Sequence, residues 1–209
     1  MKILILAPVT LLVILLAVFP VNATTYPLNL SLPDIKDIHL REGALFTTAL
    51  NASYVPGIMA WQVNITFNPQ AVAAVDYSLG SEWTTAPYIS INRTRNSNGY
   101  YLCSGFPSPT PCGNVPFIAT NHGTILAGFT YFSGHFLTTS ETTTMFTVTW
   151  KVLSRFAYSD LHIVQSSENR LLGTLLVTPL FHIQSYTTVD GFFSNCNHLP
   201  TRALGHLPT

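Results

Sequence analysis

The sequence predicts an all-β protein, folded as an antiparallel β-sandwich, and three observations favour this class. Two segments, Trp61 to Phe67 and Phe146 to Val152, alternate strictly between apolar and polar residues, which is typical of strands with one face in the core and one in water. Turn dipeptides such as Asn-Pro, Asn-Gly and Asp-Gly separate the apolar stretches. No stretch of 12 residues keeps a convincing helical period. Many short strands separated by turns therefore predict two sheets packed face to face.

The two strict segments also predict which side chains are buried. Trp61 and Trp150 have the inward phase, so we expect both indole rings in the core. Asn64 has the outward phase and is expected on the solvated face. Weaker alternation indicates further strands at Leu45 to Leu50, Ile125 to Tyr131, His162 to Val164 and Phe181 to Ser185.

The composition limits the function classes. The chain has 209 residues, of which 47% are apolar and only 9% are charged, and nine Lys and Arg balance nine Asp and Glu. A basic surface that neutralises phosphates cannot be assembled from so few charges, so we expect no nucleic-acid partner. Polarity comes instead from hydroxyl groups, with 26 Thr and 16 Ser. Such a surface on an apolar chain indicates a secreted, β-rich protein.

The N-terminus has the features of a signal peptide. Lys2 precedes an apolar run from Ile3 to Phe19, and the small-residue pattern before position 24 predicts cleavage after Ala23. The run is close to the length at which an uncleaved membrane anchor is the alternative. The expected protein is secreted or attached to the cell surface. The expected division is a signal peptide at 1–23, one domain at 24–194 and a flexible C-terminal tail at 195–209.

The three cysteines are compatible with export. Cys103 and Cys112 bracket a short Pro-rich segment, and a disulfide between them is the simplest interpretation, with three unpaired thiols as the alternative. Cys196 is then the odd cysteine, and we expect it to be free. No cysteine pair and no histidine has zinc-ligand spacing, so no metal site is expected.

Four sequons for N-linked glycosylation follow the signal peptide. Their number is only a mild excess over chance in a Thr-rich sequence, so ordinary composition remains an alternative explanation. The predicted glycosylation sites are Asn29, Asn51, Asn64 and Asn92.

Several segments together resemble one domain family. The stretch Ala60 to Pro69 resembles the early aromatic-led strand and Asn-Pro turn of cohesin-type domains, and Gly123 to Phe129 resembles their middle strand. Phe146 to Val148 resembles their later strand, and Val189 to Phe193 resembles their closing Asp-Gly-aromatic turn. The resemblance covers about 28–194. It implies a jelly-roll sandwich of about nine strands, related to carbohydrate-binding modules, with a non-catalytic adhesion role.

The sequence also departs from that family. A Thr-rich segment, Thr138 to Thr144, replaces the usual Gly- and Ser-rich loop, and the Cys103 to Cys112 insert is not typical. No duplicated Asp-rich calcium loop follows the domain, so we expect no dockerin in the same chain. None of the family's variable partner-binding residues is carried over. A surface-adhesion or sugar-binding role is therefore expected ahead of dockerin binding.

Catalytic patterns are weak in this chain. It contains no Gly-x-Ser-x-Gly and no His-Glu-x-x-His motif. The acids closest to aromatic residues are Asp76, Glu82, Asp160 and Asp190, and each has a structural interpretation at a strand end or turn. His162 and His182 have outward phases and are expected in water. We therefore expect a protein that is not an enzyme and has no cofactor.

Aromatic residues outside the alternating strands predict a binding site. Trp83, Tyr100 and Tyr101 lie in loop-like segments, and flat rings of this kind stack on sugars. The alternative is that they cap the open ends of the core. The expected partner is a polysaccharide or a cell-surface protein. In a second hypothesis the chain is a structural subunit of a surface filament or envelope layer, and Thr24 to Leu32 completes a neighbour's sheet in self-association.

Overall fold

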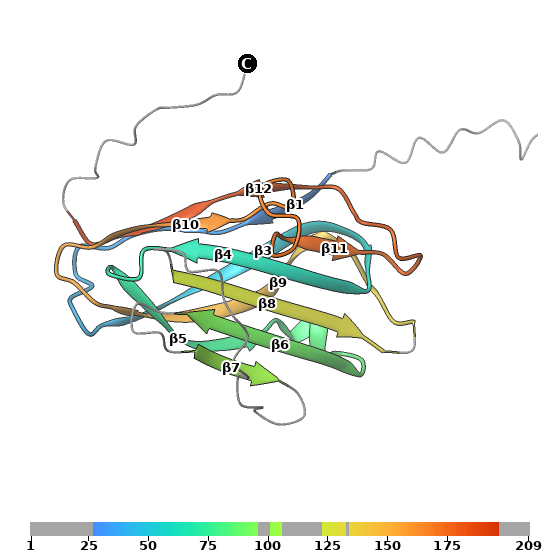
Figure 1. The fold of residues 1–209 in the computed structure, drawn as a ribbon, viewed down its shortest axis with the longest axis horizontal. Helices are drawn as coiled ribbons and strands as arrows, with labels where there is room; N and C mark the ends of the chain where they lie inside the picture. The colour runs from blue at the N-terminus through green and yellow to red at the C-terminus, as the bar shows by residue number, and fades with distance from the viewer. Residues whose placement is uncertain (1–26, 96–100, 106–122, 133, 197–209) are drawn as a thin grey trace, which may run out of the picture.

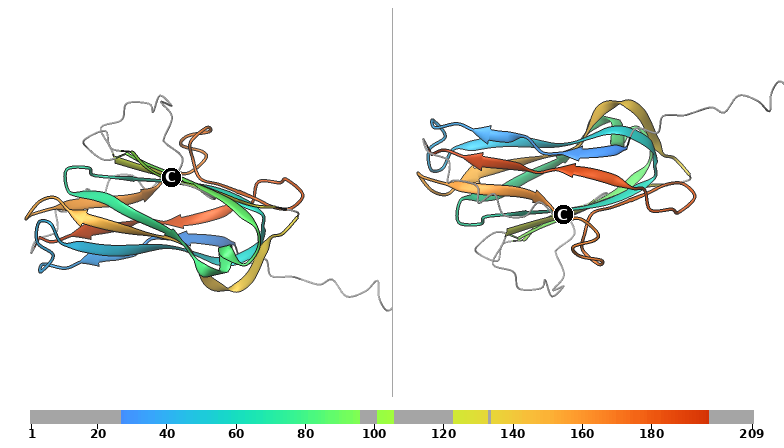
Figure 2. Two further views of the ribbon diagram at one scale, coloured as in Figure 1. Left: turned by 90° about the horizontal axis from the view of Figure 1, so that it is seen from below. Right: turned by 90° about the horizontal axis from the view of Figure 1, so that it is seen from above.

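The computed structural model describes residues 27–95, 101–105, 123–132 and 134–196. Two β-sheets pack face to face, as the two edge-on views in Figure 2 show. The β-sandwich predicted from the sequence is therefore confirmed. The only helix among the described residues is the four-residue 3₁₀ turn η1 (Ser81–Thr84). None of the helical structure in that part of the chain has the length and apolar character of a membrane span.

Thirteen strands are found among the described residues and make up the two sheets (Figure 1). One sheet has five strands in the order β12-β1-β3-β9-β5. The other has eight, in the order β2-β13-β10-β4-β8-β6-β7, with β11 paired to β4 beside β10. The strands are β1 (Leu28–Ser31), β2 (Asp34–Lys36), β3 (Leu45–Ile58), β4 (Ala60–Phe67), β5 (Val72–Leu79), β6 (Tyr88–Arg95), β7 (Tyr101–Gly105), β8 (Gly123–Tyr131), β9 (Leu137–Val152), β10 (Tyr158–Ile163), β11 (Leu175–Val177), β12 (Tyr186–Val189) and β13 (Gly191–Ser194).

Two strand pairs are parallel, which corrects the purely antiparallel prediction and its count of about nine strands. β1 pairs in parallel with β12, and β2 pairs in parallel with β13. The chain therefore passes from the five-stranded to the eight-stranded sheet twice, between β1 and β2 and between β12 and β13, and the two passages lie side by side. The two passages are in close contact, since a Cβ built at Gly191 would lie 2.3 Å from the carbonyl oxygen of Pro33. Glycine is needed there because any larger residue would collide with backbone.

The strand β1 is an internal strand of its own sheet. It lies between β12 and β3, and the side chains of Leu28 and Leu30 are fully buried. The described part of the segment Thr24 to Leu32 is therefore already paired on both sides. Completing a neighbour's sheet with it would expose two core leucines, so the strand-addition hypothesis loses its structural basis.

The core between the sheets is rich in aromatic rings. Trp61 and Trp150 are 2% and 0% exposed, which confirms the prediction from their alternation. Trp61 stacks on Phe129 at 5.5 Å between centroids, and Trp150 meets Phe67 edge-on at 5.0 Å. Trp150 Nε1 donates a hydrogen bond of 2.8 Å to Thr48 Oγ1, which satisfies its polar atom inside the core.

Trp83 belongs to the same core, and its predicted role as an exposed ligand-binding ring is wrong. The side chain is 0% exposed and lies edge-on to Trp61 at 5.9 Å and to Phe129 at 5.4 Å. The η1 turn can lie close to β9 because residue 80 is glycine. A Cβ at this position would be 1.8 Å from the carbonyl oxygen of Thr144. The alternative interpretation, in which the ring caps the core, holds for Trp83.

Replacement of Trp83 by alanine should therefore destabilise the protein severely. We expect Trp83→Ala to lower the free energy of unfolding by about 3–5 kcal/mol, since it leaves a cavity among three aromatic rings. The surface ring Phe156, 72% exposed, provides the control, and Phe156→Ala should cost less than about 0.5 kcal/mol. Urea denaturation of both variants measures the difference. Equal, small losses would show that Trp83 is not part of the core.

Candidate functional site

The ligand-binding residues predicted from the sequence do not form a site among the described residues. Trp83 is in the core, Tyr100 lies outside the described residues, and β7 is described at Tyr101 only for its backbone. The predicted Cys103–Cys112 disulfide likewise lies outside the description, since Cys112 is not covered and only the backbone of Cys103 is.

The C-terminal end of the domain is held more firmly than predicted. Asn195, expected to begin a flexible tail, is 4% exposed, and its side chain accepts a hydrogen bond of 2.6 Å from the amide of Ala157. Cys196 is half-buried and has a free thiol, and its Sγ lies 3.7 Å from the carbonyl oxygen of Ala157. The domain therefore extends beyond residue 194.

The predicted glycosylation sites differ in accessibility where the structure describes their side chains. Asn29 and Asn51 are half-buried on the outer face of the five-stranded sheet, where their Oδ1 atoms accept hydrogen bonds from Thr187 and Thr144. The side chain of Asn92 lies outside the description. Asn64 is only 5% exposed, so the expectation that it lies in water is wrong.

A loop over β4 covers Asn64. The chain leaves β10, forms the loop 164–174 and returns as β11 along the same edge of β4 (Figure 1). Gln62, which shares the outward phase, donates a hydrogen bond of 2.9 Å to the carbonyl oxygen of Gly173. Thr174 returns to the sheet, with its amide donating to the carbonyl oxygen of Val164 at 2.8 Å. The alternation of residues within β4 cannot predict that a loop distant in the sequence packs on its outer face.

A glycan on Asn64 would require the loop 164–174 to move away. We expect peptide mapping of the folded protein to find Asn64 without a glycan. Full occupancy of Asn64 in folded protein would show that this loop does not cover β4 in solution.

A histidine between two carboxylates anchors this loop. His162 Nδ1 lies 2.6 Å from Asp190 Oδ2, and His162 Nε2 lies 2.8 Å from Glu168 Oε2. The other carboxylate oxygens accept hydrogen bonds from the amides of Ile163 and Gln165. His162 therefore ties the loop 164–174 to the turn between β12 and β13, which corrects the expectation that it is simply solvated. The sequence gives no local signal for this cluster, because Asp190 is 28 residues away.

The cluster holds a charge and has the geometry of a structural clamp. The hydrogen bond to Asp190 raises the pKa of His162, burial lowers it, and the carboxylate of Glu168 raises it further, to about 9. Both ring nitrogens are engaged by the two carboxylates, and neither this cluster nor any other in the described part of the chain has the arrangement needed to hold a metal ion. The neighbouring Ser159 is fully buried, and its hydroxyl binds the amide of Asn68 and the carbonyl of Asp160.

The clamp predicts a loss of stability at alkaline pH. Because the folded pKa of His162 lies above its unfolded value, its contribution is complete below about pH 6.5 and is lost as the pH rises through about 9. We expect the unfolding free energy of the wild type to fall between pH 7 and 9.5, measured by denaturation at each pH. His162→Gln should be less stable at pH 6 and should show a smaller fall. Parallel curves for both proteins would contradict the clamp.

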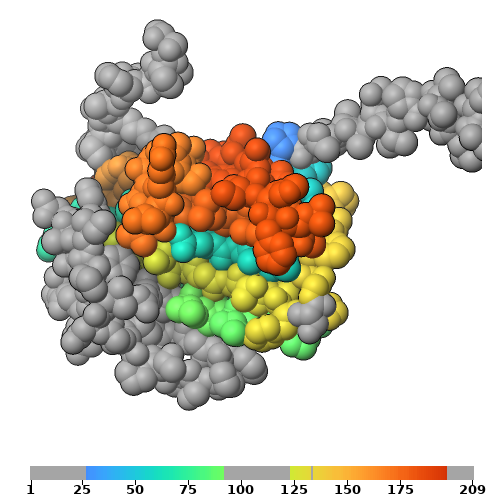
Figure 3. Space-filling view, turned by 45° about the vertical axis from the view of Figure 1, so that its right-hand side comes forward, coloured from blue at the N-terminus to red at the C-terminus, as the bar shows by residue number. Residues whose placement is uncertain are grey.

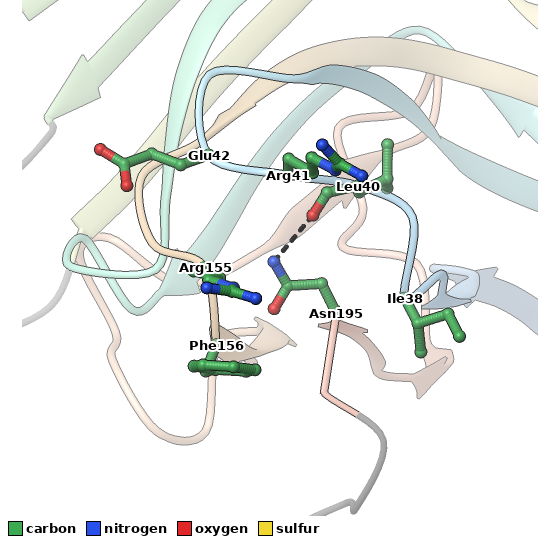
Figure 4. A pocket seen from close by; sticks show the side chains of 7 residues that line it. All are labelled: Ile38, Leu40, Arg41, Glu42, Arg155, Phe156 and Asn195. Atoms are coloured by element: carbon green, nitrogen blue, oxygen red, sulfur yellow. Dashed lines mark hydrogen bonds between the residues drawn. The ribbon is translucent and has the colours of Figure 1, made fainter.

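An arginine-lined hollow lies at one end of the sandwich (Figure 4). The β2–β3 connection contributes Arg41 and the β9–β10 connection contributes Arg155, and Asn195 lies between them. Exposed apolar side chains form part of the wall. The residues that line the hollow are Ile38, Leu40, Arg41, Glu42, Arg155, Phe156 and Asn195.

The opposite end carries an exposed apolar turn after β11. Phe181, expected in a strand, instead has a left-handed backbone with φ of 60°, and its amide donates to the carbonyl of Thr178 at 2.9 Å. The two arms of this turn are joined by an isolated bridge between Val177 and Ile183. We use the name apolar turn for Leu180, Phe181 and Ile183, which are 75%, 78% and 67% exposed.

Two further phenylalanines are exposed in the neighbouring β8–β9 connection. Phe132 and Phe136 are 42% and 54% exposed. Backbone hydrogen bonds from Met59 to Val177 and from Tyr131 to Met59 place this connection and β11 beside the same β3–β4 turn. Figure 3 shows residues 175–189 in red-orange and the β8–β9 region in yellow on one side of the molecule. The sequence does not predict this surface, because its rings come from two connections that only the tertiary fold brings together.

Comparison with known proteins identifies the fold. No family model and no curated protein matches the sequence. Among solved structures, the chain is similar to a non-cellulosomal cohesin from the archaeon Archaeoglobus fulgidus, with 9% identity, a TM-score of 0.52, and coverage of 81% of this chain and 91% of that one.

Two bacterial matches are cohesin–dockerin complexes. The sixth cohesin of scaffoldin B from Acetivibrio cellulolyticus, in complex with a mutant Cel5 dockerin, is 11% identical with a TM-score of 0.55, covering 81% of this chain and 99% of that one. The Coh-OlpA–Doc918 complex from Clostridium thermocellum gives 11% identity and 0.53, with coverage of 81% and 99%. The chain therefore has a cohesin-type fold, as its sequence motifs predict.

Proposed function

We propose that this chain is a non-catalytic protein-binding module of a secreted or surface-attached protein, and that the apolar turn is its principal contact. The fold supports the first part of the proposal, because several of the structures it resembles are cohesins bound to dockerins, which are protein partners. The single observation that carries the second part is that Phe181 combines a left-handed backbone with a ring that is 78% exposed.

Packing within the free protein does not explain why a phenylalanine occupies the left-handed position 181. A left-handed conformation costs a residue with a side chain about 1–2 kcal/mol, and glycine is the usual choice at such a position. A ring that is 78% exposed gains little from packing in the free protein. Strain retained at an exposed position is typical of functional sites, and burial of the ring by a partner would offset it.

The apolar turn is fixed before any partner binds. The amide of Thr178 donates to the carbonyl of His182 at 3.0 Å, and the amide of His182 lies 3.3 Å from Thr178 Oγ1. Leu176, one residue from the end of β11, is 1% exposed and anchors the hairpin in the core. An anchor held in place in this way loses little conformational entropy on binding.

The chemistry of the turn favours a protein over a polysaccharide. Its three exposed side chains are apolar, and the sequence as a whole is only 9% charged. Burial of apolar side chains in a complementary pocket is the usual source of affinity at protein interfaces. The sugar-binding expectation relied partly on the ring of Trp83, which is inside the core.

Substitution of Phe181 by glycine separates binding from stability. Phe181→Gly removes the exposed ring and relieves the left-handed strain, so we expect the melting temperature to stay equal or rise, by an amount corresponding to at most about 1 kcal/mol. The same variant should lose at least about tenfold in affinity for the partner, because hot-spot aromatics contribute this much or more. The partner is captured from the surface extract of the source organism, purified, and titrated by biolayer interferometry.

Leu171→Ser is the matched control for this experiment. Leu171 is 84% exposed and apolar but lies in the loop 164–174, outside the apolar turn. We expect this variant to bind as the wild type does, and binding to change little with salt, since no ion pair is involved. Unchanged affinity of Phe181→Gly, or binding only to a glycan array, would contradict the proposed function.

A further inference from the structure

We propose that the arginine-lined hollow binds an acidic peptide segment, in which a carboxylate lies next to an apolar side chain. The hollow is at the other end of the sandwich from the apolar turn and shares no residue with it. This inference therefore goes beyond the proposed function, and its test does not depend on the apolar turn.

The walls of the hollow are fixed by one buried amide. Asn195 Nδ2 donates to the carbonyl oxygen of Leu40 at 2.8 Å and to that of Ser154 at 3.1 Å, while its Oδ1 accepts from the amide of Ala157. Asn195 thus joins the β2–β3 connection, the β9–β10 connection and the end of β13. Three separate segments are held together, so the hollow is a preformed feature of the fold.

Two guanidinium groups in this hollow lack an acidic partner within the described residues. No carboxylate oxygen of the described chain lies within 4.0 Å of a guanidinium nitrogen of Arg41 or Arg155. The ion pairs within the described residues are those of His162. Glu42 also lines the hollow, but its carboxylate points away from both arginines (Figure 4). Arginine binds carboxylates through two parallel hydrogen bonds, so a ligand carboxylate supplies the missing charge.

Apolar surface flanks the two arginines. Ile38 and Phe156 are 52% and 72% exposed, although both are large apolar side chains. The guanidinium carbon of Arg155 lies 5.3 Å from the ring centroid of Phe156, which restricts the orientation of the charged group. A ligand that fits this wall has an apolar side chain next to its carboxylate.

The polar groups of the hollow favour a peptide over a neutral sugar. A neutral sugar presents hydroxyl groups but no charge that would pair with the two guanidinium groups. Asn195 provides the only amide side chain among the lining residues, and both of its N–H donors are already engaged by backbone carbonyls. Charge pairing with the arginines is the polar interaction that remains.

The test uses two synthetic hexapeptides that differ only in charge. One alternates Glu and Leu, the other alternates Gln and Leu, and both carry fluorescein and blocked ends. We expect the wild-type chain to bind the Glu peptide at least about tenfold more tightly than the Gln peptide in fluorescence anisotropy, and the difference to shrink in high salt, because screening weakens the pairing.

Variants locate the binding on the hollow. Arg155→Ala and Arg41→Ala should each weaken binding of the Glu peptide several-fold, and Arg155→Lys should fail to restore it fully, since lysine cannot bind two oxygens in parallel. Arg170→Ala removes an exposed arginine from the loop 164–174 and should change nothing. Melting temperatures of all variants should stay close to the wild type, because these side chains are at the surface.

Three results would overturn the inference. The first is no binding of the Glu peptide at about millimolar concentration by folded protein, and the second is equal binding of both peptides. The third is tighter, arginine-dependent association with vesicles that contain an anionic phospholipid, which would assign the hollow to a membrane surface instead.

Discussion

The packing of Trp61 at the centre of the sandwich is the interaction on which the rest of the structure depends. Its ring stacks on Phe129 of the same sheet and on Phe146 of the facing sheet, at 5.5 and 5.7 Å, and meets Trp83 edge-on. The three contacts fix the distance between the sheets and close the core beside η1. They also hold β4 in place, and β4 carries β11 at its edge. The position of the apolar turn therefore follows from the burial of one indole ring.

Local patterns in the sequence were sufficient for the sandwich and for part of its core. A strand with one wet face must alternate, so Trp61 and Trp150 could be assigned from their phase. Trp83 could not, because a 3₁₀ turn has no period of two and the inward direction of the ring depends on contact with β9. Asn64 has the outward phase that was predicted, yet a loop from 100 residues further along the chain covers it. The phase of a residue predicts its side of the sheet and not what packs on that side.

The candidate site features could not be predicted from the sequence for related reasons. His162 is joined to Asp190 and Glu168 by the tertiary fold, and each of these residues has an ordinary local setting. Phe181 lies in an apolar segment that resembles a strand, and only its positive φ shows that the chain turns there. The arginine-lined hollow combines residues from three segments that are far apart in the sequence. The His162 cluster and the hollow exist because segments that are distant in the sequence meet on the double sheet. This arrangement agrees with a scaffold whose binding sites lie in its connections.

The most direct test of a protein-binding role for the apolar turn is a hydrogen–deuterium exchange footprint of the chain with its captured partner. Residues 177–183 begin at the end of β11, and only a few backbone hydrogen bonds hold this turn, so its amides should exchange readily in the free protein. Our account predicts that the partner slows exchange in this segment, with a weaker effect in residues 134–137 beside it and none in β1. Unchanged exchange across residues 177–183, with protection elsewhere on the sandwich, would contradict it.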